Sequence, residues 1–222
     1  MQIMILSGIL AAISTAAASP VLAETELSIY SGWQTAPHSR VYGDYPGTGA
    51  EIDALIGWEG KSFEMPPYYG VRGTWWKNEN LGFGLEFTHT KVYAPDDEKA
   101  AIGFSDLEFT DGLNILTANA YQRWPGAWAE GAITPYVGGG LGVAVPHVDV
   151  DTTTGVETFE YQYTGPAARL TAGMSYDLND RFAVFGEYQF TYSSNTVDLP
   201  EGGELESDIK TNAINLGLTL KF

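Results

Sequence analysis

The three histidines of the chain, His38, His89 and His147, are the side chains best suited to chemistry at neutral pH. Imidazole serves as an acid, a base or a metal ligand in that range. Each histidine falls near the same end of an expected strand, and simple alternation places His89 on the face of Phe87 and His147 on the face of Val143. The pattern predicts either a shared metal or catalytic site at one rim, or three unrelated rim residues.

A segment between the first two expected strands, residues 58–69, combines aromatic side chains, two carboxylates and a lysine with two consecutive prolines. This composition suits an amphipathic glycolipid better than it suits a mobile loop tip. Its carboxylates, Glu59 and Glu64, are candidate catalytic residues beside the histidines. The candidate substrate-binding residues are Arg40, Trp58, Lys61, Tyr68 and Tyr69.

The elements that must position these residues are strands. Residues 214–222 alternate apolar side chains with small or polar ones and end on Phe222. In an exported bacterial protein, such a strand closes an outer-membrane β-barrel with lipid outside and a polar lumen inside. The sequence therefore predicts an all-β fold, an eight-stranded antiparallel transmembrane β-barrel, located in the bacterial outer membrane.

Alternation and turn residues predict one barrel domain over residues 24–222. Residues 51–60 also have a strand pattern, but bacterial barrels have even strand counts, short periplasmic turns and longer external loops. We therefore expect residues 34–68 to form one long, structured first extracellular loop, with solvated acidic tips at 96–98 and 201–208. The eight expected strands are 27–33, 69–76, 81–93, 107–124, 134–150, 159–176, 181–194 and 209–222.

Composition narrows the class further. Residues 1–23 have an apolar stretch and a small-residue cleavage site, which predicts a cleaved signal peptide. The chain has no cysteine, and its formal net charge of -17 argues against a nucleic-acid partner. We expect a monomer in the outer membrane.

Charged residues within the expected strands point inward by alternation, namely Arg72, Arg169, Glu86 and Glu187. We interpret them as a salt-bridge network that fills the lumen, because eight strands leave no open channel. The glycine-rich run 138–142 lies inside a strand and lacks the spacing of a dinucleotide loop. We read it as lumen wall, and no flavin or NAD motif is present.

Four stretches resemble the outer-membrane lipid A oxidase family of rhizobia and their relatives, and the second is the most specific. They are Thr35-Ala36-Pro37-His38-Ser39-Arg40-Val41, residues 57–70, Phe109-Thr110-Asp111-Gly112-Leu113-Asn114 and Val145-Pro146-His147-Val148. The resemblance implies oxidation of the proximal glucosamine of lipid A to 2-aminogluconate by dioxygen. It makes lipid A, or lipopolysaccharide, the expected partner.

Dioxygen is a poor direct acceptor of electrons from a sugar, so the implied reaction needs a flavin or a redox metal. The resemblance supplies no residue set for this metal, and we predict that its ligands are His38, His89 and His147, with Glu59 or Glu64 beside them. Such a set favours non-haem iron, with copper or manganese as alternatives. The competing hypothesis is a non-enzymatic structural or surface-interaction barrel of the OmpA type.

Overall fold

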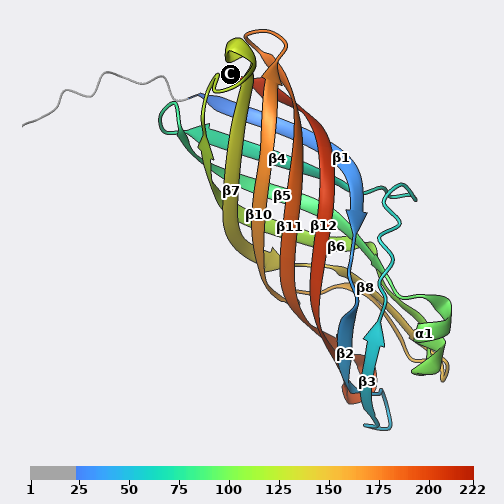
Figure 1. Ribbon diagram of the computed structural model, residues 1–222. Helices are drawn as coiled ribbons and strands as arrows, with labels where there is room; N and C mark the ends of the chain where they lie inside the picture. Colours follow the sequence, from blue (N-terminus) through green and yellow to red (C-terminus); the bar gives the residue numbers. More distant parts are fainter. Residues whose placement is uncertain (1–23) are drawn as a thin grey trace, which may run out of the picture.

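The computed structural model describes residues 24–222, so the expected signal segment lies outside the described residues. Eight of the described strands form a ring, which the pairing of β1 with β12 closes. Figure 1 shows these strands as a tilted barrel with the C-terminus beside the start of β1. The ring consists of β1 (Thr25–Thr35), β4 (Tyr69–Trp76), β5 (Leu81–Tyr93), β6 (Phe104–Arg123), β7 (Ile133–Ala144), β10 (Gly165–Asp177), β11 (Phe182–Leu199) and β12 (Gly203–Lys221).

Short connections join the strands at the end that holds Glu24 and Phe222, over residues 77–80, 124–132 and 178–181. One of them contains the 3-10 turn η1 (Ala129–Gly131), and a second 3-10 turn, η2 (Pro200–Gly202), joins β11 to β12 at the opposite end. No helix of the described residues is both long and apolar enough to cross a membrane.

Near the short turns, the barrel is apolar outside and polar inside. On β12, Ile214 and Leu216 are 61% and 73% exposed, while Asn215 and Thr219 are buried in the lumen. The other ring strands repeat this alternation, which is the pattern required when lipid surrounds a polar interior. The alternation predicted for residues 214–222 is confirmed, and so are the inward positions predicted for Arg72, Glu86, Arg169 and Glu187.

Further from the short turns, the same strands reverse their polarity. On β12, the inward residues Leu205 and Ile209 are buried, and the outward residues between them are Glu206 and Asp208. The inward and outward positions keep their parity along the strand, so only the character of the side chains changes. This half of the molecule therefore has an apolar core and a polar exterior, as a protein in water does.

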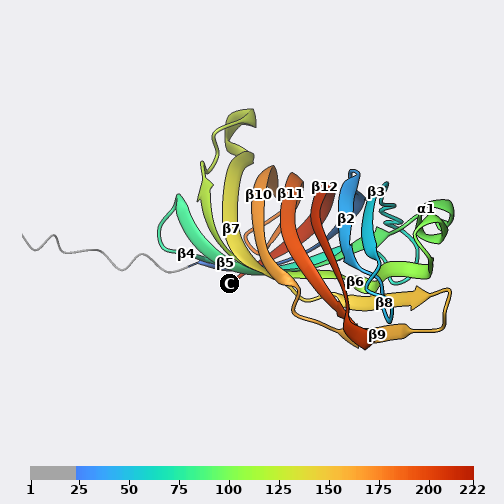
Figure 2. The ribbon, with the colours of Figure 1, turned by 90° about the horizontal axis from the view of Figure 1, so that it is seen from below.

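Two sheets enclose that apolar core. One contains the outer parts of β11 and β12 together with β2 (Ser39–Asp44) and β3 (Glu51–Ile56). The other contains the start of β6 with β8 (His147–Thr152) and β9 (Glu157–Tyr161). In Figure 2, β2 and β3 lie on one side of this half and β8 and β9 on the other. We call this half the sandwich, and the core includes Ile52, Phe104, Phe109, Val150, Val197 and Leu205.

The helix α1 (Asp96–Ala101) connects β5 to β6 at the edge of the sandwich. Its three acidic residues stand in the first turn, where they complement the helix dipole. Lys99 Nζ lies 3.0 Å from carboxylate oxygens of both Asp96 and Asp106, which fastens the helix to β6. The expected acidic tip at 96–98 is thus a short helix with an exposed acidic face.

The structure corrects three expected strands. Strand 134–150 is broken at Pro146, where the chain leaves β10 and joins β6 and β9 as β8. Strand 159–176 is likewise two strands, β9 and β10. Strand 209–222 begins earlier, at Gly203, so most of the expected acidic loop 201–208 is strand. Residues 51–56 pair with β2 alone and stay outside the ring, as expected.

We predict that Phe104→Ala loosens the sandwich without dissolving the ring. Phe104 is fully buried in the apolar core, and such a truncation costs about 3–5 kcal/mol. Protease should then cut the sandwich strands faster, while the folded barrel keeps its heat-modifiable migration on a gel. The control Leu216→Ala removes a lipid-facing side chain and should leave cleavage unchanged. Equal protease resistance of Phe104→Ala and wild type would contradict a sandwich that depends on this core.

Candidate functional site

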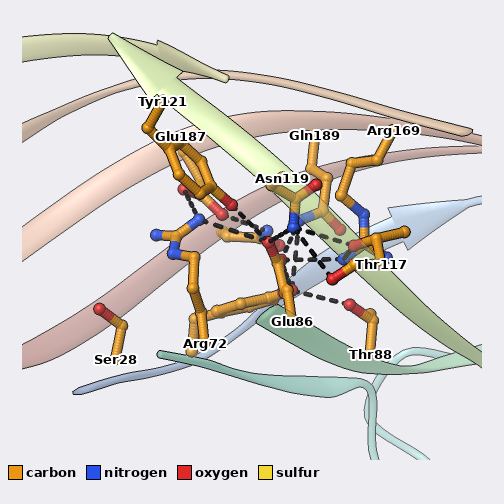
Figure 3. Close-up of polar contacts among 12 residues, drawn as sticks. Ser28, Arg72, Glu86, Thr88, Thr117, Asn119, Tyr121, Arg169, Glu187 and Gln189 are labelled. Carbon is orange, nitrogen blue, oxygen red and sulfur yellow. Dashed lines mark hydrogen bonds and ion pairs between the residues drawn. The ribbon is translucent and has the colours of Figure 1, made fainter. Parts of the chain in front are cut away.

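A charged cluster occupies the lumen, and Glu86 lies at its centre (Figure 3). The carboxylate accepts hydrogen bonds from the hydroxyls of Tyr30 at 2.5 Å and Tyr121 at 2.8 Å. Gln189 Nε2 donates to it at 2.8 Å, and Arg169 Nη1 lies 3.0 Å away. Arg169 and Glu86 are both about 1% exposed, so this part of the lumen is filled.

A second ion pair lies beside the first. Arg72 Nη1 is 3.0 Å from Glu187 Oε2 and 3.8 Å from Glu86. Glu187 also accepts from the Tyr136 hydroxyl at 2.6 Å and from Asn215 Nδ2 at 3.2 Å. Two arginines thus balance two glutamates, as predicted, and hydrogen bonds supply the satisfied geometry that a buried pair requires. We assign this cluster a structural role.

The glycine-rich run 138–142 makes room for this cluster. A Cβ at Gly138 would lie 2.3 Å from the Tyr121 ring, and one at Gly140 would lie 2.1 Å from Asn119 Oδ1. Positions 138 and 140 therefore require glycine, because the Tyr121 and Asn119 side chains lie directly against them. This agrees with the interpretation of the run as lumen wall.

The predicted histidines have separate surroundings. His38 is exposed beyond β1, and its Nε2 would lie 2.8 Å from a Cβ placed on Gly57. His89 is buried, bonds through Nδ1 to Asn114 Oδ1 at 3.1 Å, and stacks on the Tyr69 ring. His147 is buried on β8, edge-on to the rings of two aromatic residues of β9, Phe159 and Tyr161.

No group of three or more His, Cys, Asp or Glu side chains within residues 24–222 is arranged to hold a metal ion. The structure therefore does not bring His38, His89 and His147 together. The break at Pro146 is one reason, because it carries His147 into the sandwich instead of leaving it on the lipid-facing side of β7. Another is that β6 lies between β5, which carries His89, and β8.

The segment 57–69 closes a gap in the barrel wall between β1 and β5, above the start of β4. Glu59 forms a bridge with Tyr93 of β5, and its backbone N donates to the Tyr93 carbonyl at 2.8 Å. On the other side, Gln34 N donates to Ser62 Oγ at 2.9 Å. Tyr68 enters the lumen, where its hydroxyl donates to Asn215 Oδ1 at 3.0 Å. The backbone of this segment therefore packs onto the rim of the barrel.

The remaining predicted residues of this region take different roles. Trp58 is buried in the sandwich core, and its Nε1 donates to Ser39 Oγ at 2.7 Å. Arg40 pairs with Asp53 on the outer face of the sandwich. The Glu59 carboxylate lies 3.5 Å from Lys61 Nζ. Glu64 contributes its backbone carbonyl, which accepts from Lys91 Nζ at 2.7 Å.

Two apolar side chains of the same segment are exposed, Phe63 at 72% and Met65 at 83%. Phe63 borders an outward-facing groove of 370 Å³, which Trp33, Trp58 and Lys61 also line. Trp33 pairs across the strands with Ile214, a residue of the lipid-facing band. We call this groove the rim groove, and it combines apolar walls with a lysine at the upper edge of the lipid-facing band.

The sequence analysis missed Lys91, which is fully buried beneath segment 57–69 on β5. It also missed the charged outer face of the sandwich. In the strand register, Asp198 is opposite Glu204, Glu204 is opposite Asp44, and Asp44 is opposite Glu51. Four carboxylates thus form one row across four strands, which we call the acidic row. Like charges in such positions are destabilising.

Neighbouring groups show the same negative field. A hydrogen bond to the Glu206 carboxylate raises the pKa of the Tyr42 hydroxyl on the outer face of β2. On the opposite sheet, burial, together with repulsion from Asp149 and Glu157, raises the pKa of the Asp151 carboxyl. The alternation of acidic and apolar residues over 204–209 was the sequence signal for this face.

The family model for the outer membrane protein beta-barrel domain matches residues 8–222. Neisserial surface protein A has a similar structure, with 14% identity and a TM-score of 0.50, over 90% of this chain and 97% of that one. OprG from Pseudomonas aeruginosa is 16% identical, with a TM-score of 0.48, over 89% and 95% of the two chains. At this identity, such likeness concerns the fold alone. No curated protein matches the sequence.

The chain therefore belongs to the outer membrane protein beta-barrel family, and its location is the outer membrane. Barrels of this kind have short turns in the periplasm and long loops outside. The sandwich is accordingly the external half of the molecule.

We predict that Glu86→Ala destabilises the barrel by about 3–5 kcal/mol, because it leaves the buried Arg169 guanidinium without its charge partner. The unfolding midpoint in urea, measured in lipid vesicles, should fall markedly. Glu79→Ala, which removes an exposed carboxylate from a short turn, provides the control. An unchanged midpoint for Glu86→Ala would show that the ion pairs do not hold the lumen together.

Proposed function

We propose that this member of the outer membrane protein beta-barrel family is a non-enzymatic surface-interaction barrel, and that its external sandwich binds cationic partners. The observation that carries the proposal is the distribution of charge. The external segments 36–68, 91–113, 145–164 and 192–210 hold 20 of the 28 acidic residues but only five of the 11 basic ones. A surface with such an excess attracts cations and steers their association.

The architecture supports the same function. The lumen cluster leaves no evident path for solutes, and a plugged barrel needs no external sandwich in order to stay closed. A second hydrophobic core above the membrane instead holds the acidic row rigidly in place. Because like charges in a row lower stability, their presence on a rigid sheet indicates selection for binding rather than for folding.

Binding of poly-L-lysine to the barrel in nanodiscs tests this function. The triple variant D44N/E51Q/E204Q removes three carboxylates of the acidic row, and we expect it to weaken binding about ten-fold at low salt, with less salt dependence. The matched control E79Q/E130Q/D180N removes three carboxylates from the short-turn end and should change binding less than two-fold. Equal binding by both variants would contradict a partner site on the sandwich.

A second candidate function is oxidation of lipid A, and the rim groove favours it. The groove lies at the edge of the lipid-facing band, and Lys61 in its lining would supply a positive charge for a phosphorylated headgroup. The reaction would break the C–H and O–H bonds of the hemiacetal and form the lactone carbonyl. The two electrons and two protons released would reduce dioxygen to hydrogen peroxide. Water would then open the resulting lactone to 2-aminogluconate, for a net gain of one oxygen atom.

The redox metal that this chemistry implies remains a prediction. The histidines do not form a donor set in the described residues, so the metal does not fit them, and we derive no step through it. Binding of lipid A, as part of lipopolysaccharide, would require only the rim groove and not the metal.

Incubation of the purified barrel with 1-dephosphorylated lipid A in air separates the two functions. The surface-interaction function predicts no change in the mass of the lipid. A gain of one oxygen that is lost in Trp33→Ala and kept in the distant lipid-facing variant Leu170→Ala would instead establish oxidation at the rim groove.

A further inference from the structure

The β3 strand has one paired edge and one open edge. At the hairpin turn, Tyr45 N donates to the Ala50 carbonyl at 2.8 Å, which makes this a hydrogen-bonded pair. In an antiparallel ladder, hydrogen-bonded and non-hydrogen-bonded pairs alternate. We apply this alternation to the register of β2 with β3, which runs from the pair Asp44–Glu51 to the pair Ser39–Ile56. The backbone N–H and C=O groups of the even-numbered residues of β3 then point towards β2. Those of Glu51, Asp53 and Leu55 point away from it.

The next residues along the chain confirm this assignment. Gly57, two positions beyond Leu55, directs its N–H outward and donates to Glu98 Oε2 at 2.6 Å. Glu59, two further on, bridges to Tyr93 of β5. The same edge is thus occupied at 57 and 59. At Glu51, Asp53 and Leu55, no backbone hydrogen bond to another described residue is present on that side.

The chain itself explains why this edge is open. The β5 strand runs alongside segment 57–59 but ends at Tyr93, and Pro95 precedes helix α1. Proline lacks the N–H that a ladder needs, so β5 cannot continue along β3. The chain forms the helix instead, so no strand of this chain pairs with that edge of β3. Figure 1 shows β3 at the margin of the sandwich, with α1 beside it.

The side chains at this edge indicate what would pair with it. Glu51 and Asp53 are exposed on the outer face; Glu51 ends the acidic row, and Asp53 also pairs with Arg40 of β2. Leu55 is 59% exposed on the same face. Two copies of β3 pairing edge to edge would bring acidic side chains together, which is a recognised protection against self-association. An extended segment with basic residues beside Glu51 and Asp53 and an apolar residue beside Leu55 is complementary.

We propose that β3 accepts an extended cationic peptide as an added strand, with main-chain hydrogen bonds to Glu51, Asp53 and Leu55. This is recognition by strand addition, in which the backbone supplies affinity and alternate side chains supply specificity. The inference rests on the proposed function, because it names the kind of partner and the place where it binds. It adds a requirement that general attraction to an acidic surface does not have, namely an extended backbone in register with β3.

The experiment uses the full barrel in nanodiscs and an eight-residue peptide with valine at every second position. The positions between the valines are lysine, except for one leucine placed to lie beside Leu55. Amide hydrogen exchange, followed by NMR, should show the N–H groups of Glu51, Asp53 and Leu55 exchanging quickly without peptide. With peptide bound, we expect their exchange to slow at least ten-fold, whereas the amides of Ile52 and Ala54 are protected throughout. Binding of the peptide without protection of the odd-numbered amides would overturn the proposal, and so would absence of binding.

Two variants at one position separate the backbone from the charge. Asp53→Pro removes an outward N–H and no bond to β2, and we expect at least ten-fold weaker binding. Asp53→Asn keeps the N–H but removes the charge and the ion pair with Arg40, both of which Asp53→Pro also removes, so binding should fall only two- to three-fold. Equal losses in the two variants would contradict strand addition. If Asp53→Pro exposes the amides of Ile52 and Ala54, the variant has disturbed β3 itself, and a modified peptide is used instead. This peptide is N-methylated along one edge, so that it cannot donate main-chain hydrogen bonds to β3. If it binds wild type as tightly as the unmodified peptide does, strand addition is contradicted.

These outcomes can be distinguished from failure of the proposed function. Poly-L-lysine binding that depends on the acidic row, without protection of the β3 edge, would refute strand addition and leave the surface-interaction function intact. If the variant D44N/E51Q/E204Q binds poly-L-lysine as tightly as wild type does, both strand addition and the surface-interaction function are refuted.

Discussion

The structure depends on one constraint: its longest strands pass through two solvents. Lipid surrounds the half near the short turns, so apolar side chains must point outward there and polar ones inward. Water surrounds the sandwich, where the opposite arrangement is stable. Because alternation keeps each position on the same face, β12 can satisfy both solvents only by changing residue type near Ile209 and Thr211. This reversal sets the boundary of the membrane and divides the molecule into its two halves.

Each half has its own source of stability. In the membrane half, the lumen is held by balanced ion pairs and tyrosine hydroxyls around Glu86 and Glu187. Such a cluster fixes the cross-section and fills it, which leaves little room for transport or for a catalytic centre. In the sandwich, an apolar core supplies the stability, so the side chains of its outer face can be charged. The acidic row and the open edge of β3 are both consequences of that freedom.

Much of the fold could be predicted from alternation. The bounds of β4 and β5 follow directly from the sequence, and so does the inward position of Arg72, Arg169, Glu86 and Glu187. The break at Pro146 was harder to predict, because β7 and β8 are both apolar on one face and only the change of partner separates them. The start of β12 was missed because acidic residues at every second position resemble a loop when lipid is the assumed solvent. In water, that same pattern is an ordinary strand with one buried face.

The candidate site was harder to predict than the fold. Histidines near one end of their strands suggested convergence, but neighbouring strands and the break before β8 keep them apart. The open edge of β3 leaves no mark in composition, since it depends on where β5 ends and on which backbone groups β2 already uses. Only the register shows it. The rim groove likewise arises where segment 57–69 replaces a strand in the wall, an arrangement that local sequence does not encode.

The most direct test of this account is cysteine labelling in intact cells, because the chain has no cysteine of its own. A membrane-impermeant maleimide should label Tyr42→Cys on the outer face of the sandwich without any treatment of the cells. It should label Glu130→Cys at the short-turn end only after the outer membrane is permeabilised, and Leu216→Cys in the lipid-facing band in neither case. Labelling of Leu216→Cys in intact cells, or of Tyr42→Cys only after permeabilisation, would contradict the division of the strands between lipid and water.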